Sequence, residues 1–240
     1  LGSNLLVRDG GIKGTVIVMN GGLRKIHNDE NLIYTEAGVS CSKLSKFSAK
    51  EGLANSAFFS GIPGTVGGAL FMNAGCYGSE TWDYVQKVLM INLNGDQIER
   101  KKSDFQISYR EVKNSNKGEY FLAAWFKFPK GNKDKAENEI KELLAHRKNT
   151  QPLDWPTAGS TFRNPKDNFA AKLIEDCGLK GYQLGGAKVS EKHANFIINL
   201  GNASALDIEK VIIYIQKVVY EKKNIQLLRE IKIIGEKIGS

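Results

Sequence analysis

The sequence lacks any apolar stretch that could cross a membrane. A membrane-spanning helix needs roughly 18–20 consecutive apolar residues, and the longest candidates here, such as Val211–Ile215, are far shorter. The chain also does not begin with methionine, and Leu1–Val7 contain no charged segment followed by an apolar one, as a signal peptide would. These first residues resemble a turn that leads into a strand. We therefore expect that a segment before Leu1 is missing and that the protein is cytoplasmic.

Disulfide and metal-binding patterns are also absent. The sequence has only three cysteines, an odd number without a C-x-x-C pair, and three widely separated histidines without an H-E-x-x-H motif. This argues against a disulfide framework or a zinc ribbon and suits a reducing compartment, so we expect no metal site. The cysteines are Cys41, Cys76 and Cys177.

The composition is typical of a folded protein with many tight turns. Of the 240 residues, 41% are hydrophobic and 25% are charged, and glycine is abundant (25) while proline is scarce (5). Glycine in excess without proline indicates close backbone approaches rather than flexible linkers. The length allows one or two domains. With 34 basic and 26 acidic residues, the net charge is +8.

Hydrophobic patterns predict an α+β protein in two unequal parts. Two prolines in Gln151–Pro156 cannot continue a helix and mark the best domain boundary. The predicted strands are Thr15–Met19, Leu32–Ala37, Val85–Leu93, Tyr120–Phe128, Asn195–Leu200 and Glu230–Ile234. The predicted helices are Ser40–Glu51 with Ser40 as N-cap, a helix that buries Ala136, Ile140, Leu143 and Leu144, the segment Phe169–Cys177, and a long helix opened by the capping box of Ser204 and Asp207.

The densest glycine cluster lies at residues 61–78, where six of eighteen residues are glycine. Such a cluster can form a concavity of backbone N–H groups that accepts phosphate oxygens or a flat ring. It can equally form a pair of tight turns or a barrel corner. Two familiar phosphate-binding motifs are excluded, because the chain contains neither G-x-G-x-x-G nor G-x-x-x-x-G-K-[ST]. A dinucleotide would need a different scaffold.

Segments along nearly the whole chain resemble, in order, the UDP-N-acetylenolpyruvoylglucosamine reductase family. Each segment alone is a weak signal, whereas the ordered set is strong. The segments are Gly2–Val7, Asp9–Gly11, Gly61–Gly68, Asn73–Gly78, Tyr109–Arg110, Ala158–Pro165, Gly185–Ala187, His193–Phe196, and Glu230 ahead of Ile233–Gly235. The resemblance implies a flavoenzyme that uses NADPH to reduce UDP-N-acetylglucosamine enolpyruvate to UDP-N-acetylmuramate, a precursor of peptidoglycan.

The resemblance also implies a fold: an FAD-binding fold of the vanillyl-alcohol oxidase type, N-terminally incomplete, with a smaller α+β substrate-binding domain. It assigns residues 1–150 to the FAD-binding part, 151–229 to the substrate domain, and 230–240 to a strand that returns to the FAD-binding part. Non-covalent FAD would contact the first turn and the glycine-rich loops, although the first turn alone also suits an ordinary β-turn. The implied cofactor-binding residues are Gly2, Ser3, Asn4, Leu5, Gly61, Ile62, Pro63, Gly64, Gly67, Gly68, Asn73, Gly75 and Tyr77.

Three catalytic residues are implied by the same resemblance. Ser160 would donate a proton to the carbon that becomes enolate-like after hydride transfer from the flavin, since such a carbon accepts a proton from a weak acid. Arg110 would bind the substrate carboxylate with its guanidinium fork, and Glu230 would act there as an acid or through a water. From the residues alone, Ser160 could instead cap a turn, Arg110 could be a solvated charge, and Glu230 could be a carboxylate at a strand edge.

The implied substrate-binding residues are Tyr109, Asn164, His193 and Asn195. Some members of the family carry an additional loop with a tyrosine that folds over the ligand. The interval from Gly159 to Glu230 leaves little room for it, so the chain resembles the shorter subgroup. We expect a monomer whose partners are NADPH and the enolpyruvyl nucleotide.

Two alternatives stay open. A basic chain could bind nucleic acid, but its lysines are spread over polar helix faces without interleaved aromatic residues, so we expect no nucleic-acid partner. The chain could also be another FAD-dependent oxidoreductase of the same fold, with Cys76 as the tether for a covalent flavin. Acid precipitation distinguishes these two flavoenzymes, because only a covalent flavin precipitates with the protein.

Overall fold

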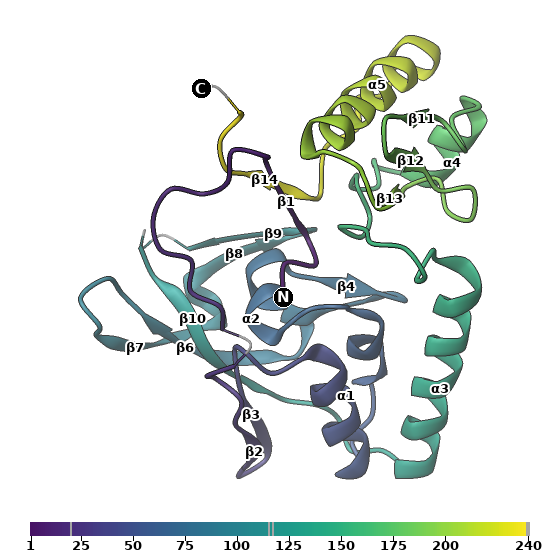
Figure 1. Cartoon of the computed structure of the whole chain (residues 1–240). Coiled ribbons are helices and arrows are strands. Elements are labelled where there is room, and N and C mark those ends of the chain that lie inside the picture. Colours follow the sequence, from purple (N-terminus) through teal and green to yellow (C-terminus); the bar gives the residue numbers. More distant parts are fainter. Residues whose placement is uncertain (20, 115, 117, 239–240) are drawn as a thin grey trace. The chain divides into compact units, whose positions relative to one another are not determined.

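The computed structural model describes residues 1–19, 21–114, 116 and 118–238. Contacts within the chain divide it into two compact units, whose elements are drawn in Figure 1. Unit 1 consists of Ile17–Arg147 with Leu1, and unit 2 consists of Gly2–Val16 and the chain from Lys148 onward. The change of unit at residues 147–148 lies close to the expected boundary at residue 150. However, the contacts group residues 2–16 and the last strand with unit 2 rather than with the rest of the first 150 residues.

Unit 1 is built on a five-stranded antiparallel sheet with the strand order β2-β3-β10-β6-β7. Three of the predicted strands are confirmed as β3, β6 and β10, where β-branched and aromatic residues fit a pleated, half-buried surface. The strands of this sheet are β2 (Ile26–Asp29), β3 (Leu32–Glu36), β6 (Val85–Ile91), β7 (Gln97–Lys101) and β10 (Tyr120–Phe126).

Two helices, α1 and α2, share one apolar core with this sheet. The first helix begins where the sequence predicts, because the Ser40 hydroxyl accepts the Lys43 N–H at 3.2 Å and so satisfies a free amide of the first turn. The third helix buries only Ala136 and Ile140 of its predicted apolar face. The helices of unit 1 are α1 (Cys41–Lys50), α2 (Val66–Met72) and α3 (Lys133–Thr150).

Short elements that the hydrophobic pattern did not predict connect the sheet and the helices of unit 1. They are the hairpin of β4 (Gly75–Cys76) and β5 (Ser79–Glu80), the hairpin of β8 (Phe105–Ser108) and β9 (Glu111–Asn114), and the 3₁₀ helices Ala57–Gly61, Thr81–Asp83 and Lys102–Asp104. Two to five residues carry no detectable periodicity, so such elements escape a pattern search.

The described part of unit 2 contains two small sheets and two helices. Strand β1 (Leu5–Val7) pairs in parallel with β14 (Lys232–Ile234), so the last strand returns to the beginning of the chain. The other sheet is antiparallel, and the predicted strand at 195–200 is confirmed within it as β13. The remaining elements are β11 (Gln183–Leu184), β12 (Ala187–Val189), β13 (Ile197–Asn199), α4 (Ala170–Asp176) and α5 (Ala205–Lys223).

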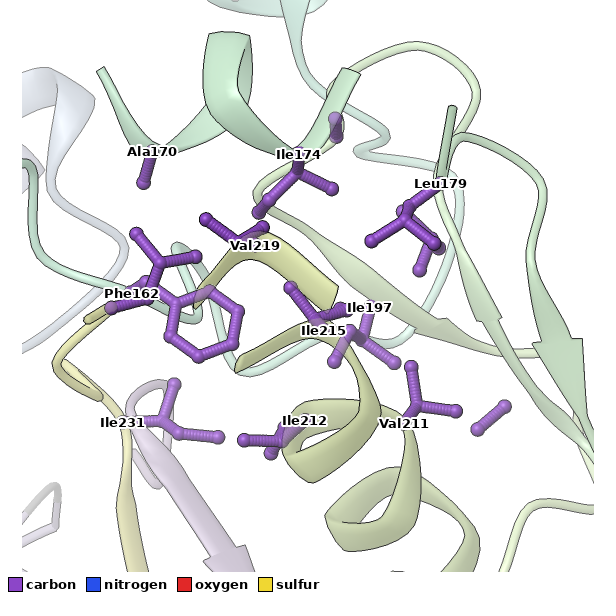
Figure 2. Packing of buried hydrophobic residues seen from close by; sticks show 14 of the residues in the cluster. Phe162, Ala170, Ile174, Leu179, Ile197, Val211, Ile212, Ile215, Val219 and Ile231 are labelled. Atoms are coloured by element: carbon purple, nitrogen blue, oxygen red, sulfur yellow. The ribbon is translucent and has the colours of Figure 1, made fainter. Parts of the chain in front are cut away.

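The core of unit 2 is formed around α5. Figure 2 shows Ile212, Ile215 and Val219 of α5 in one cluster with Phe162 and Ile231, which come from distant parts of the sequence. Burying an apolar side chain of this size contributes roughly 1.5–3 kcal/mol. The predicted capping box at the start of α5 is confirmed: the Ser204 hydroxyl accepts the Asp207 N–H at 3.0 Å, and the Asp207 carboxylate accepts the Ser204 N–H at 3.1 Å.

Three predictions of local structure need correction. Thr15–Met19 forms no strand, and Val16, Ile17 and Val18 are exposed, because β-branched residues form a strand only where a neighbouring strand pairs with them. Leu144 of α3 is 38% exposed rather than buried, since only a narrow stripe of this helix meets the core. Glu230 lies before the last strand, which begins at Lys232. No helix in the described part of the chain is long and apolar enough to span a membrane.

Candidate active site

Arg110 lies at the tip of the β8–β9 hairpin, in a two-residue turn with Tyr109. Its φ of +57° falls in the left-handed region, which residues with a Cβ seldom adopt. The guanidinium donates to the Asn73 carbonyl at 3.2 Å and to the Gly75 carbonyl at 2.6 Å, and its Nη1 lies 3.5 Å from Oε1 of Glu80. Because the side chain is only 14% exposed, Arg110 is not the solvated surface charge that its local sequence allowed.

Asn73 ends α2 in a left-handed conformation and is almost completely buried. Its side-chain amide donates to the Glu80 carboxylate at 2.7 Å and to the Ser108 carbonyl at 3.2 Å, while its side-chain oxygen accepts the Trp82 N–H at 3.1 Å. Asn73 therefore joins α2 to the β4–β5 hairpin and to the β8–β9 hairpin. This geometry favours a role in holding Arg110 over a direct side-chain contact with a cofactor.

The Gly61–Gly68 loop has most of its backbone donors bonded within unit 1. The N–H groups of residues 62, 64, 66 and 67 donate to protein carbonyls, and that of residue 68 donates to the Thr65 hydroxyl. Glycine is needed at Gly67, where a Cβ would lie 2.9 Å from the Cβ of Ala37. Of the two interpretations of the glycine cluster, tight packing therefore accounts for these positions. Gly68 is exposed, and a Cβ there would meet nothing closer than 3.7 Å, which leaves its backbone open to a ligand.

Tyr77 and Cys76 follow the glycine-rich loop in the β4–β5 hairpin. The Tyr77 side chain is partly exposed, and its hydroxyl donates to the Leu143 carbonyl at 3.2 Å. The Cys76 thiol donates to the Phe58 carbonyl at 3.1 Å. Burial raises the pKa of Cys76 to about 11, although the positive charges of Arg110 and Arg147 act in the opposite direction. A thiol with this pKa is a weak nucleophile at neutral pH.

Ser160 lies in unit 2, directly before an extended segment that pairs with the chain around Glu230. The Glu230 N–H donates to the Thr161 carbonyl at 2.9 Å, and the Arg163 N–H donates to the Leu228 carbonyl at 2.8 Å. This pairing brings Ser160 and Glu230 close together although 70 residues separate them. Ser160 is half-buried, and its hydroxyl makes no hydrogen bond to any residue in the described part of unit 2.

Asn195 is buried beside Ser160 and bonds to the main chain of the same segment. Its side chain accepts the Phe162 N–H at 3.0 Å and donates to the Phe162 carbonyl at 2.8 Å, as a neighbouring strand would. Its carbonyl also accepts the Thr161 N–H at 2.8 Å. Asn195 therefore fixes the segment that carries Ser160, and its own amide is directed at the protein.

The Gly2–Asn4 turn contacts the chain at Glu230 through Asn4. The Asn4 side chain donates to the Glu230 carbonyl at 3.4 Å, and the Asn4 carbonyl accepts the Lys232 N–H at 2.9 Å. The backbone N–H groups of Ser3 and Asn4 have no partner among the described residues. A pair of free, neighbouring N–H groups in a glycine turn suits the negative charge of a pyrophosphate. Leu5 follows as the first residue of β1.

His193 and Asn164 also belong to unit 2. The Nδ1 atom of His193 accepts the Asn195 N–H at 3.3 Å, and burial lowers the pKa of the His193 ring. The ring is therefore kept neutral near neutral pH. The Asn164 side-chain oxygen accepts the Ala170 N–H at 3.0 Å, at the start of α4.

The predicted site residues thus form two clusters. Arg110, Asn73 and Gly75 contact one another in unit 1. In unit 2, Glu230 and Asn195 bond to the segment that follows Ser160, Asn4 bonds to Glu230, and His193 bonds to Asn195. Sequence reasoning missed Glu80, which contacts both Asn73 and Arg110. Its only signal in the sequence is its position shortly after Asn73, at the end of the β4–β5 hairpin. A cavity of about 830 Å³ at Lys130–Glu142 includes none of the predicted residues. No group of three His, Cys, Asp or Glu side chains suited to a metal occurs among the described residues.

Comparison with known proteins identifies both parts of the chain. Residues 1–100 match the family described as "FAD binding domain", and residues 151–234 match "UDP-N-acetylenolpyruvoylglucosamine reductase, C-terminal domain". The chain is 46% identical to the UDP-N-acetylenolpyruvoylglucosamine reductase of Nitrosomonas eutropha, over 100% of this chain and 76% of the relative. It is 49% identical to the reductase of Nitrosococcus oceani, over 98% of this chain and 79% of the relative.

A solved structure gives the same result for the fold. The crystal structure of UDP-N-acetylenolpyruvylglucosamine reductase from Thermus caldophilus matches with a TM-score of 0.84 and 31% identity, covering 97% of this chain and 82% of that one. The α+β fold class and the FAD-binding domain expected from the sequence are confirmed. With nearly half of its residues identical to those of curated relatives along its whole length, the chain belongs to the UDP-N-acetylenolpyruvoylglucosamine reductase family.

Proposed function

We propose that the protein is an NADPH-dependent flavoenzyme that reduces the enolpyruvyl ether of UDP-N-acetylglucosamine enolpyruvate and so forms UDP-N-acetylmuramate for peptidoglycan synthesis. The observation that carries the proposal is the pairing of residues 161–163 with 228–230, which brings Ser160 and Glu230 together within the part that matches the reductase C-terminal domain. This pairing supports the roles of proton donor and acidic group that we propose for these two residues.

The residues present fit an FAD cofactor. The free N–H groups of Ser3 and Asn4 suit its pyrophosphate, and the open backbone at Gly68 and the exposed Tyr77 ring suit contact with a planar group. When bound, FAD would supply the hydride chemistry between NADPH and the substrate. We assign the remaining cofactor-binding positions to the Gly2–Leu5 turn, the Gly61–Gly68 loop and Gly75.

Ser160 would protonate the substrate carbon next to the carboxylate. Its hydroxyl is not committed to any described protein group, so it can donate to the substrate. The main-chain bonds of Thr161 and Phe162 to Asn195 hold the Ser160 backbone in place before substrate binds. A preorganised donor avoids reorganisation during the reaction.

Arg110 and Glu230 would act on the substrate carboxylate. Negative charge spreads into this carboxylate as the carbanion character develops, and a fixed guanidinium stabilises that charge more than the ground state. Two carbonyls and Glu80 hold the guanidinium of Arg110 in unit 1. Glu230 would hold a proton or orient a water beside Ser160. Tyr109, Asn164 and His193 would contact the nucleotide.

A covalent flavoenzyme of the same fold is the second candidate, with Cys76 as its tether. The raised pKa of Cys76 and its bond to the Phe58 carbonyl disfavour attack on a flavin, since the thiolate is the reactive form. Nucleic-acid binding is not favoured. We further expect the protein to be cytoplasmic, monomeric and a member of the shorter subgroup. Sedimentation of the purified protein would test its oligomeric state.

Absorbance spectroscopy of the FAD-loaded protein tests the function. We expect the visible flavin bands to bleach when NADPH is added without oxygen and to recover when the enolpyruvyl nucleotide follows. UDP-N-acetylglucosamine, which lacks the enolpyruvyl group, is the matched control and should not restore the bands. If neither nucleotide restored the bands, this result would contradict the proposed reaction. Flavin that precipitates with acid-denatured protein would favour the covalent alternative.

A further inference from the structure

Glu80 is a charged residue at the centre of the unit 1 cluster for which the reaction so far has no role. It ends β5, and its side chain is about two-thirds buried, with 32% exposed. Its Oε2 accepts the Asn73 amide at 2.7 Å, while its Oε1 lies 3.5 Å from the Arg110 guanidinium. One carboxylate thus contacts both the residue that ends α2 and the predicted substrate-binding arginine.

The three contacts of Glu80, Asn73 and Arg110 form a closed set. Asn73 donates to Glu80 through its side chain and accepts from Arg110 through its carbonyl, and Glu80 faces Arg110 directly. The position of Glu80 is itself fixed, because its backbone N–H donates to the Asp83 carboxylate at 2.8 Å. Arg110 has a long side chain that loses considerable entropy when it is held in one place. A charged partner on a fixed turn offsets that cost.

The backbone of Arg110 gives a second reason for such a restraint. A left-handed residue at the tip of a two-residue turn is strained, by about 1 kcal/mol or more for a residue with a Cβ. Strained backbone persists where the surrounding contacts determine it. The bonds from the guanidinium to the Asn73 and Gly75 carbonyls and its contact with Glu80 are such contacts.

We propose that Glu80 is a positioning residue for Arg110: its carboxylate, tied to the Asn73 amide, holds the guanidinium where it meets the charge that develops on the substrate. This role rests on the proposed function. Because the guanidinium stabilises the transition state more than the bound substrate, its displacement lowers kcat more than it raises KM. Glu80 touches neither reacting atoms nor flavin in this role, so reduction of the flavin by NADPH is unaffected.

The test uses Glu80→Gln in the FAD-loaded protein. Glutamine retains an oxygen that can accept the Asn73 amide but loses the charge that faces Arg110. We expect kcat to fall about 10-fold, as misplacement of a catalytic group does, with KM and the rate of flavin reduction by NADPH within about 3-fold of the unchanged protein. The control is Glu99→Gln, which removes an exposed ion pair with Lys87 in the same unit and should leave all three values unchanged.

A double-mutant cycle shows whether Glu80 acts through Arg110. In an Arg110→Lys background, Glu80→Gln should lower kcat by less than about 2-fold, because lysine cannot form the forked contacts of the guanidinium. Equal losses in both backgrounds would overturn the proposal, as would a parallel fall in the NADPH half-reaction. If Glu80→Gln does not fold, Glu80→Asp is used instead: it keeps the charge but withdraws the carboxylate from Asn73 and Arg110, and its loss should likewise shrink in the Arg110→Lys background.

Nuclear magnetic resonance separates this proposal from the proposed function. The Nη–H signals of Arg110, assigned by their loss in Arg110→Lys, should exchange with water faster in Glu80→Gln than in the unchanged protein, because Nη1 faces Glu80. Unchanged exchange would overturn the positioning role even if the enzyme turns over the nucleotide. Faster exchange in a protein that does not reduce the nucleotide would support the positioning of Arg110 and contradict only the proposed reaction.

Discussion

The two clusters of candidate site residues are held in different ways. In unit 1, Arg110 is held by carbonyls at the end of α2 and in the β4–β5 hairpin and by the carboxylate of Glu80, so charge and side-chain bonds fix its functional group. In unit 2, Ser160 is held through its main chain, by the pairing of the next residues with the chain at Glu230 and by the Asn195 amide.

This difference follows from the chemistry that each residue would perform. A long, permanently charged arginine needs partners for its guanidinium, because a partly buried charge without them is costly. The oxygen of a serine depends on a single side-chain torsion, so fixing the backbone limits it to three staggered positions. The hydroxyl then remains available for the substrate. We therefore expect changes in unit 2 to separate structure from activity more cleanly than changes in unit 1.

Ser160→Ala gives the sharpest separation. Removing the proton donor should lower kcat for the enolpyruvyl nucleotide by about 10²–10⁴-fold, the usual contribution of a general acid. Reduction of bound FAD by NADPH and the thermal unfolding temperature should change little, since the hydroxyl bonds to no described protein group. Stopped-flow absorbance measures the two half-reactions separately.

Ser103→Ala is the control for this substitution. Ser103 is exposed in the 3₁₀ helix Lys102–Asp104 of unit 1, so neither half-reaction should respond. Loss of both half-reactions in Ser160→Ala would contradict its assignment as proton donor, because flavin reduction does not need that proton. A large fall in stability would contradict the claim that the segment is held without the Ser160 hydroxyl.

Cys76 tests the electrostatics of unit 1. With a pKa of about 11 instead of an ordinary value near 8.5–9, the thiolate fraction at pH 7 falls by about 100-fold. We expect iodoacetamide to modify Cys76 in the native protein about 100-fold more slowly than a free thiol, as followed by mass spectrometry of its peptide. Modification at the rate of a free thiol would show that the charges of Arg110 and Arg147 outweigh burial, and would strengthen the covalent-flavin alternative.

Asn195→Ala tests the main-chain scaffold of unit 2. The substitution leaves the Phe162 N–H and carbonyl unpaired in a buried place, and each unpaired group costs about 1–3 kcal/mol. We expect the free energy of unfolding to fall by about 2–3 kcal/mol, as measured by urea denaturation. Asn138→Ala on the exposed face of α3 is the control. If both variants were equally stable, the side chain of Asn195 would not hold this segment, and a direct contact with substrate would become its better explanation.

Much of the framework of both clusters can be predicted from local sequence. Ser40 and Ser204 mark the starts of α1 and α5, because the hydroxyl of each serine accepts a free amide N–H of the first turn. In α5, Asp207 completes the capping box. The long apolar strands of unit 1 are visible because their residues suit a sheet. The site residues themselves were found through the resemblance of ordered motifs, since a single serine or arginine carries no local signal of function.

What the sequence hides is pairing between distant segments. Thr15–Met19 has the composition of a strand but no partner strand, whereas the segment after Ser160 has no strand pattern and yet pairs with residues 228–230. Glu80 was missed for the same reason: its importance comes from Asn73 and Arg110, which approach it only in the folded chain. Local propensity cannot report contacts that tertiary structure creates.

His193 gives the mildest test of unit 2. Burial lowers the pKa of its ring, so the unfolded chain, whose histidine has a pKa near 6.5, binds the proton more readily than the folded one. The free energy of unfolding therefore has its full value above about pH 7.5 and falls as the pH drops through 6.5 toward the lowered pKa. His193→Asn, whose side-chain oxygen can replace the acceptor Nδ1, should reduce this dependence in urea titrations between pH 5 and 8. An equal pH dependence in both proteins would mean that groups other than His193 cause it.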